Sequence, residues 1–185
     1  LYLGPNNTFN SNFSYTGKAI TLYGNTFQGT TTIKVNGTTT TSSYGGNVFN
    51  GSTLIQDSSS TAHSLYLATG AADDYNGDVT FVQKGTGVSL YPAYTKNSTF
   101  AKNITLDGTT SMQLGGSGGK VIMDGTTAQS ITSGNTSLFP TIKKLQVNKA
   151  SGSLTLYTPL TISDSLQLTQ GRINTDTTNL LTIAH

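Results

Sequence analysis

One short phrase, a polar residue followed two positions later by an aromatic residue, returns five times along the chain. The aromatic residues of successive phrases are separated by 18, 22, 26 and 25 positions, and they are Phe9, Phe27, Phe49, Tyr75 and Phe100. A phrase that returns at such a step is typical of repeat architectures, in which each unit buries its apolar face only against neighbouring units. The recurrence therefore predicts a stacked repeat fold.

Inside each phrase the apolar residues alternate with polar ones. The residues six positions beyond the aromatic residue are all apolar, and they are Tyr15, Ile33, Ile55, Phe81 and Leu106. A period of two predicts a β-strand with one buried face. Weaker alternating runs such as "KAITLYG" and "SLYLATG" stand between the phrases, so each repeat is expected to have two short strands and two turns.

Two all-β architectures fit this pattern, a pair of antiparallel sandwiches or a parallel β-helix. Sandwich strands differ from one another in sequence, whereas this phrase returns with the same residue types at the same offsets. We therefore predict a right-handed parallel β-helix (β-solenoid) with irregular coils of about 18–26 residues. Equivalent residues of such coils stack at roughly 4.8 Å, and the ten residues named above form the predicted core stacking ladder.

The corners of the coils carry two further rows. Asn7, Asn25 and Asn47 precede the aromatic residues by two positions, which predicts a ladder of hydrogen-bonded amides. Gly29, Gly51 and Gly77 follow the aromatic residues by two positions, which predicts positive φ or close backbone approach at a bend. On this basis Gly77→Val should destabilise the fold far more than a change at Asp57 or Ser58.

The phrase dominates residues 1–130, and residues 131–185 are expected to continue as shorter coils rich in Leu and Ile. The segment "SGNTSLFPT" between these parts predicts a protruding loop or a slight break around residues 131–141. The chain starts at Leu1 and stops within an alternating run, so we expect it to have been cut from a longer protein.

Composition narrows the classes of partner and cofactor. The chain has no cysteine, which leaves no disulfide framework and no thiolate metal site. Its formal charge of +2 is spread thinly, so no nucleic-acid or anionic-membrane partner is expected. No apolar run has the length of a membrane span, and membrane insertion is not predicted.

One acidic cluster raises the question of calcium. Asp73, Asp74, Asn76 and Asp78 stand close together in "DDYNGD". The spacing of an EF-hand fails, because its sixth loop position would be Val79 rather than Gly. We therefore predict a solvated corner, with no metal and no cofactor.

Catalysis and glycan binding are the remaining candidates for chemistry. The eight acids are all Asp and mostly scattered, and His63 is isolated in a Ser/Thr-rich segment, so no catalytic residues are predicted. A β-helix polysaccharide lyase or hydrolase stays as an alternative. Tyr91 and Tyr94 flank Pro92 at a turn, which makes them candidate glycan contacts, unless they fill the core.

Several segments carry a family resemblance: "GNTFQGTTTI", "YNGDVTF", "SLYPAY" and, above all, the run from "TIKKLQV" to "NLLTIA". Together they resemble the repeat regions of giant surface proteins of Bacteroidetes-type bacteria, which are exported by type IX secretion and act as adhesins or filament components. The resemblance covers most of the chain. It implies an extracellular, cell-surface location and a structural role in a stiff stalk or appendage used in adhesion.

The same resemblance implies the partners. These are adjacent segments or other copies of the same large protein, in a homo-oligomer or filament. A glycan-binding adhesive module that contacts cell-surface glycans is the alternative.

Overall fold

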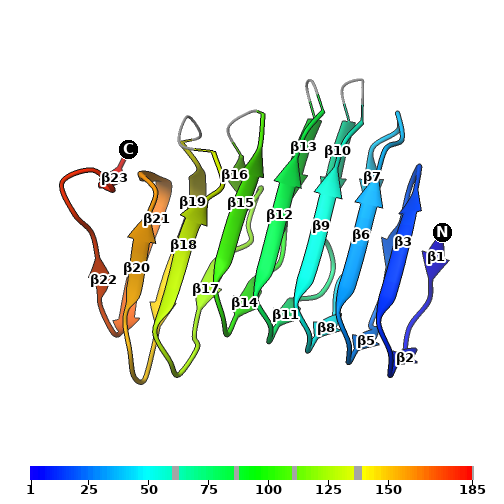
Figure 1. Cartoon of the computed structure of the whole chain (residues 1–185), viewed down its shortest axis with the longest axis horizontal. Coiled ribbons are helices and arrows are strands. Elements are labelled where there is room, and N and C mark those ends of the chain that lie inside the picture. The colour runs from blue at the N-terminus through cyan, green and yellow to red at the C-terminus, as the bar shows by residue number, and fades with distance from the viewer. Residues whose placement is uncertain (60–62, 86–87, 110–111, 136–138, 185) are drawn as a thin grey trace.

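The computed structural model describes residues 1–59, 63–85, 88–109, 112–135 and 139–184, and the fold is all-β, with no helix in these ranges. The strands lie side by side along one axis, with the two termini at opposite ends (Figure 1). Every strand pairing in the described ranges is parallel. The predicted parallel β-solenoid is confirmed, and the antiparallel alternative is excluded.

Sheet I has ten strands and contains the five recurring aromatic residues. Along the axis its strands are β2 (Thr8–Phe9), β5 (Thr26–Phe27), β8 (Val48–Phe49), β11 (Asp73–Tyr75), β14 (Ser98–Phe100), β17 (Val121–Met123), β19 (Thr141–Asn148), β21 (Leu160–Gln170) and β23 (Leu181–Ile183). The tenth strand, β16 (Gln113–Leu114), pairs with the start of β19.

Sheet II has eight strands and forms the regular face of the solenoid. Its strands are β3 (Phe13–Gly17), β6 (Thr31–Val35), β9 (Thr53–Asp57), β12 (Val79–Gln83), β15 (Ile104–Gly108), β18 (Gln129–Ser133), β20 (Leu154–Tyr157) and β22 (Ile173–Asn174). Strand β18 crosses the predicted division at residue 130 and pairs with both β15 and β20, so sheet II continues from one predicted part into the other.

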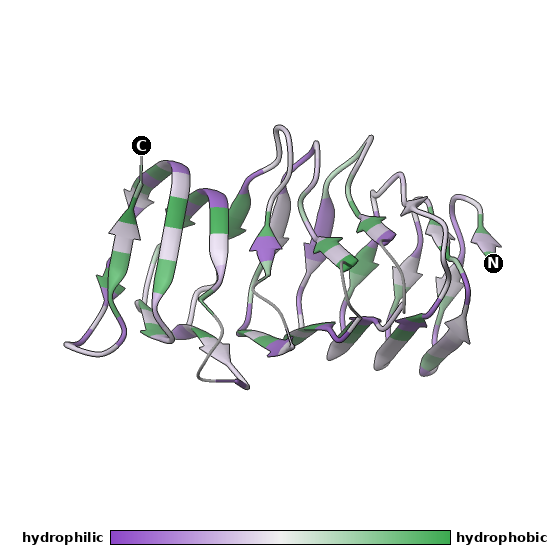
Figure 2. Ribbon diagram, turned by 90° about the horizontal axis from the view of Figure 1, so that it is seen from above, coloured by the Kyte–Doolittle hydropathy of each residue, from purple (hydrophilic) through white to green (hydrophobic). Residues whose placement is uncertain are grey.

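A third face closes the early coils, so each of them has three short strands rather than the predicted two. It contains the pair β1 (Tyr2–Leu3) and β4 (Thr21–Leu22), and the group β7 (Thr41–Ser42), β10 (His63–Tyr66) and β13 (Val88–Tyr91). Seen from above, the chain winds round a common axis through these faces (Figure 2). Because alternate side chains point inward, each coil contributes a few apolar residues to one continuous core.

The late coils have a different cross-section. Strand β16 contacts β13 of the third face. Strand β19 pairs with β16 through Thr141 and Ile142 and with β17 through Leu145 to Val147, so one strand continues both the third face and sheet I. Strand β21 does the same over 11 residues, with register shifts against β19 that mark two bulges. Near the C-terminus, Figure 2 shows these strands as arcs banded by alternating apolar and polar residues.

Candidate functional site

The five recurring aromatic residues form one stack inside sheet I. Successive ring centroids lie 5.0, 5.0, 4.8 and 4.9 Å apart, with interplanar angles of 7° or less. Four of the rings are fully buried, and Phe9, at the first coil, is half-buried. Parallel rings at strand spacing fix the register, because a slip of one residue would turn every ring outward.

The second predicted row runs through sheet II. Tyr15, Ile33, Ile55, Phe81 and Leu106 are register partners on consecutive strands. The Phe81 ring stands edge-on to the rings of Tyr75 and Phe100, at 5.8 and 6.2 Å. The two rows therefore face each other across the core.

The amides lie in a ladder at the corner before sheet I. Asn7 Nδ2 donates to Asn25 Oδ1 at 2.8 Å, and Asn25 donates to Asn47 Oδ1 from its backbone nitrogen at 3.1 Å and from Nδ2 at 3.3 Å. Asn47 donates to Asp73 Oδ1 from both nitrogens, at 2.9 and 2.8 Å. Burial raises the pKa of Asp73 to about 6, against the lowering effect of the Asn47 donors.

Close approach, not positive φ, explains the glycine corner. A Cβ on Gly29 would lie 2.8 Å from backbone atoms of Ser11 and Asn12, and a Cβ on Gly51 or Gly77 would clash with the backbone of the preceding coil's glycine. None of the three has positive φ; that conformation occurs at Gly24 and Gly45, one corner earlier. The stacked glycines leave room for backbone to lie directly over backbone.

Asp57, which the sequence comparison treats as a milder site than Gly77, is itself buried and hydrogen-bonded. Its side chain is fully buried at the end of β9, where Oδ1 accepts hydrogen bonds from the nitrogen and hydroxyl of Ser59. Oδ2 lies 2.7 Å from Nδ1 of His63, which begins β10 and is also buried, so the histidine is not isolated. The pair joins the end of sheet II to the start of the third face.

A second buried polar group lies in the late coils and was not predicted. The side chain of Lys149 is 1% exposed and reaches Gln129, whose own amide nitrogen donates to backbone carbonyl oxygens of the preceding coil. The alternation of inward and outward side chains along a strand is the sequence signal that could have placed both residues inside. Lys149 follows the inward Val147 by two positions, and Gln129 precedes the inward Ile131 by two. Asp57 and His63 share the parity of inward residues in the same way.

The tyrosines gather on the outside of the third face. Tyr91 and Tyr94 are half-buried, and with Tyr66 they form a cluster with centroid distances of 5.4, 4.0 and 5.6 Å. On neighbouring coils, Tyr23 and Tyr44 form an exposed pair at 4.5 Å. We call these five residues the tyrosine strip.

Glycines support two rings of the strip. A Cβ on Gly70 would clash with the ring of Tyr44, and one on Gly116 would clash with the ring of Tyr94. Each ring therefore lies close against backbone of the next coil, which limits its movement.

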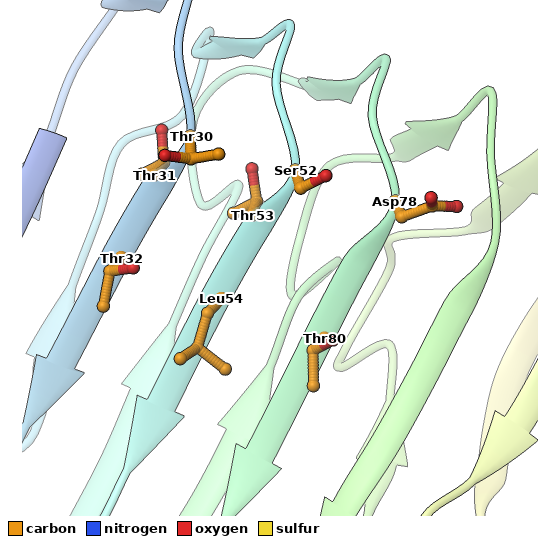
Figure 3. Close-up of a pocket in the computed structure, with 8 residues that line it drawn as sticks. All are labelled: Thr30, Thr31, Thr32, Ser52, Thr53, Leu54, Asp78 and Thr80. Carbon is orange, nitrogen blue, oxygen red and sulfur yellow. The ribbon is translucent and has the colours of Figure 1, made fainter. Parts of the chain in front are cut away.

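The outer face of sheet II is rich in hydroxyl groups. Thr32, Leu54 and Thr80 are register partners on β6, β9 and β12, and they lie in line along three adjacent strands (Figure 3). Ser52 and Asp78 lie at the strand starts beside them and complete a shallow depression. Apart from Leu54 and Asp78, the residues that line this depression carry hydroxyl groups.

Comparisons with protein-family models, curated proteins and solved structures found no match for the chain. No helix among the described residues is long and apolar enough to cross a membrane. The same residues contain no group of three His, Cys, Asp or Glu side chains placed to hold a metal ion.

The acidic cluster that suggested calcium is dispersed by strand alternation. Asp73 points inward, whereas Asp74 accepts a hydrogen bond from Thr99 Oγ1 at 2.6 Å and another from Asn76. Asp78 accepts from the backbone nitrogen and amide of Asn103 on the next coil. Each carboxylate has its own protein donors, and the three do not converge on one point.

Proposed function

We propose that this chain is a structural segment of a large secreted cell-surface protein, in which it forms a stiff stalk or part of an extracellular appendage used in adhesion. The unbroken stack of aromatic rings and amides through successive coils carries the proposal. Each coil of a solenoid contacts only its neighbours, so such a rod lengthens by adding coils without a new core. The extracellular location rests on the sequence resemblance.

The two ends support partners of the same kind. Phe9 and Phe13 at the first coil are only half-buried, and Leu168 and Ile183 at the last coils are 56% and 48% exposed. The outermost strands of both long sheets pair on one side only, so their outer backbone groups are open to another strand. Further coils of the same protein, or another copy of it, would cover both edges in a filament or homo-oligomer.

Electron microscopy of cells that make the protein tests this proposal. Gold-labelled antibodies raised against the folded segment should mark thin projections outside the cell envelope. Circular dichroism of the purified segment provides the control that the antigen is folded. Label confined to the cell interior, or to compact particles without projections, would contradict the proposed role.

A glycan-binding adhesive module is the second candidate, favoured by the tyrosine strip. Aromatic rings held against backbone present a preformed surface at low entropic cost, and tyrosine adds a hydroxyl for polar contacts. The strip spans neighbouring coils, which suits a chain of sugar rings rather than a single sugar.

Glycan-array binding of the purified segment tests this candidate. We expect the double variant Tyr66→Ala with Tyr94→Ala to lose binding that the unchanged segment shows. Tyr157→Ala is the matched control, because Tyr157 is 61% exposed but lies on sheet II, outside the strip. A folded segment that binds no glycan, or binding that survives the double variant, would eliminate the strip as a glycan site.

A further inference from the structure

The link between sheet I and sheet II changes in the late coils. Residues 28–30 and 50–52 make three-residue links, whereas residues 124–128 and 149–153 make links of five. In the link 124–128, the carbonyl groups of Gly125 and Thr127 accept hydrogen bonds from a side chain inside the corner. That side chain is Lys149, which belongs to the following coil.

The ammonium group of Lys149 is fixed in this corner. Nζ donates to Gly125 O at 2.6 Å, to Thr127 O at 2.7 Å and to Gln129 Oε1 at 2.6 Å. Lys149 and Gln129 are 1% and 2% exposed, and Gly171 of the next coil lies against the Cβ of Lys149. An amine and a primary amide are therefore held in contact in a site closed to bulk water.

We propose that Lys149 and Gln129 condense into an intramolecular amide cross-link between consecutive coils, with release of ammonia. This covalent modification goes beyond the proposed structural role and does not depend on it. The bond that forms joins Nζ to Cδ of Gln129, and the bond that breaks joins Cδ to Nε2. No oxidant, reductant or external enzyme is needed.

The separation of the reacting atoms favours attack. With Nζ 2.6 Å from Oε1 and a carbonyl bond of about 1.2 Å, Nζ lies no more than about 3.8 Å from Cδ. Reactive geometries hold the two atoms roughly 3–3.5 Å apart, so only a small movement of the lysine terminus is required.

The surroundings of the amide suit both halves of the reaction. The backbone N–H of Gly125 donates to Oε1 at 3.0 Å, where negative charge develops when Cδ becomes tetrahedral. Nε2 donates to the carbonyl oxygens of Phe100 and Lys102, both at 2.7 Å. These two acceptors hold the leaving nitrogen in place as it becomes ammonia.

The protons balance through a nearby carboxylate. Three acceptors suit the ammonium form of Lys149, so one proton must leave before attack. Burial lowers the pKa of Lys149, and burial together with the charge of Asp74 raises the pKa of Asp124, at the start of the same link. Asp124 takes the proton and returns it to Nε2; a second proton passes from Nζ to the departing ammonia, which leaves as ammonium.

The cross-link would serve a chain that has no cysteine. It closes a loop of 20 residues and adds a covalent bond between two coils that are joined otherwise by the main chain, hydrogen bonds and packing. In the chain-entropy view, such a closure restricts the unfolded chain as a disulfide does.

Intact mass spectrometry of the natively purified protein tests the proposal. We expect a mass lower than the sequence mass by about 17 Da, the mass of one ammonia. The deficit should survive denaturation and reduction. A protein that keeps its full sequence mass after prolonged incubation at neutral and mildly alkaline pH would overturn the proposal.

Tryptic mapping locates the bond. Modified Lys149 resists cleavage, so the peptide of residues 121–143, which contains Gln129, should appear joined to the uncleaved peptide 145–172. A mass deficit located at any other pair of residues would overturn the assignment to this corner.

Three variants complete the test. Lys149→Met should restore the sequence mass, while the exposed control Lys96→Met should keep the deficit. Asp124→Asn should slow the appearance of the deficit and change its pH dependence. A deficit that persists unchanged in Lys149→Met would overturn the proposal even if that variant is less stable.

Discussion

The early and late coils differ in which corner contains buried polar side chains and in which side chains these are. In the early coils, the third face and sheet I meet at a corner. The amides of Asn25 and Asn47 fill this corner and bond to each other along the axis. In the late coils that corner is absent, because β19 and β21 run through it as single strands with bulges. The polar filling lies instead at the next corner, where Lys149 and Gln129 bond to backbone carbonyls.

The polar filling of the corner between sheet I and sheet II depends on the length of the link between these two sheets. A three-residue link such as 50–52 brings glycine backbone directly over glycine backbone and leaves no interior space. A five-residue link turns carbonyl groups inward, and a buried carbonyl without a donor costs roughly 1–3 kcal/mol. In the link 124–128, the side chain of Lys149 supplies those donors.

Substitution in the aromatic stack should break the early coils most severely. Phe49→Ala removes a fully buried ring that contacts the rings of Phe27 and Tyr75 on both sides, and large-to-small core changes of this kind cost about 3–5 kcal/mol. Chemical denaturation measures the loss. Phe139→Ala is the control, since that ring is 58% exposed, and an equal loss in both variants would argue against the stack as the main support.

The corresponding break in the late coils is Lys149→Met. In the hydrogen-bonded form, removal of Lys149 leaves the carbonyls of Gly125 and Thr127 without donors, and we expect a loss of about 3 kcal/mol in the free energy of unfolding. Hydrogen exchange should show the increase in opening around β18 and β20 before it appears in β6 and β9. Lys96→Met, on the surface, should change neither quantity.

Sequence alone could predict the fold and the repeated rows for a physical reason. Phe27, Phe49 and Tyr75 occupy equivalent positions in successive coils. The pattern therefore occurs several times in the sequence, and one substitution in it does not prevent its recognition. The amide ladder belongs to the same class, because Asn25 and Asn47 bond to residues of their own row.

The buried polar pairs occur only once each, and their partners stand in different slots. Asp57 bonds to a residue on another face, and Lys149 bonds across a link whose length does not repeat. Strand parity places each of these side chains inside the coil. It does not identify the partner, which depends on where the chain turns.

Asp57→Ala removes the buried carboxylate–histidine pair of the early coils. The change leaves His63 and the Ser59 hydroxyl without their acceptor in a buried site, and we expect a loss of about 2 kcal/mol. Ser58→Ala, next to it and half-buried, should cost well under half of that in thermal denaturation. Similar melting temperatures for the two variants would contradict the buried pair.

The smallest change in the free energy of unfolding is expected for a substitution at Asp73, and this change should be stabilising. Its folded pKa of about 6 lies above the usual 3.8, so its contribution to stability is complete at acidic pH and is lost as pH rises through about 6. Two pKa units correspond to roughly 3 kcal/mol at most. Asp73→Asn keeps an oxygen for the Asn47 donors and removes the buried charge, so we expect about 1–2 kcal/mol of added stability at pH 8.

The pH profile distinguishes this cause from a general change in surface charge. Asp73→Asn should flatten the fall in unfolding free energy between about pH 4 and pH 7, because the titrating group is gone. Asp164→Asn, which removes a partly exposed carboxylate that lies 3.8 Å from Lys144, should leave that slope in place. If the unfolding free energy of Asp73→Asn still fell between about pH 4 and pH 7, a group other than Asp73 would cause the fall. The corner of the early coils would then hold a buried carboxylate as readily as the late corner holds the ammonium group of Lys149.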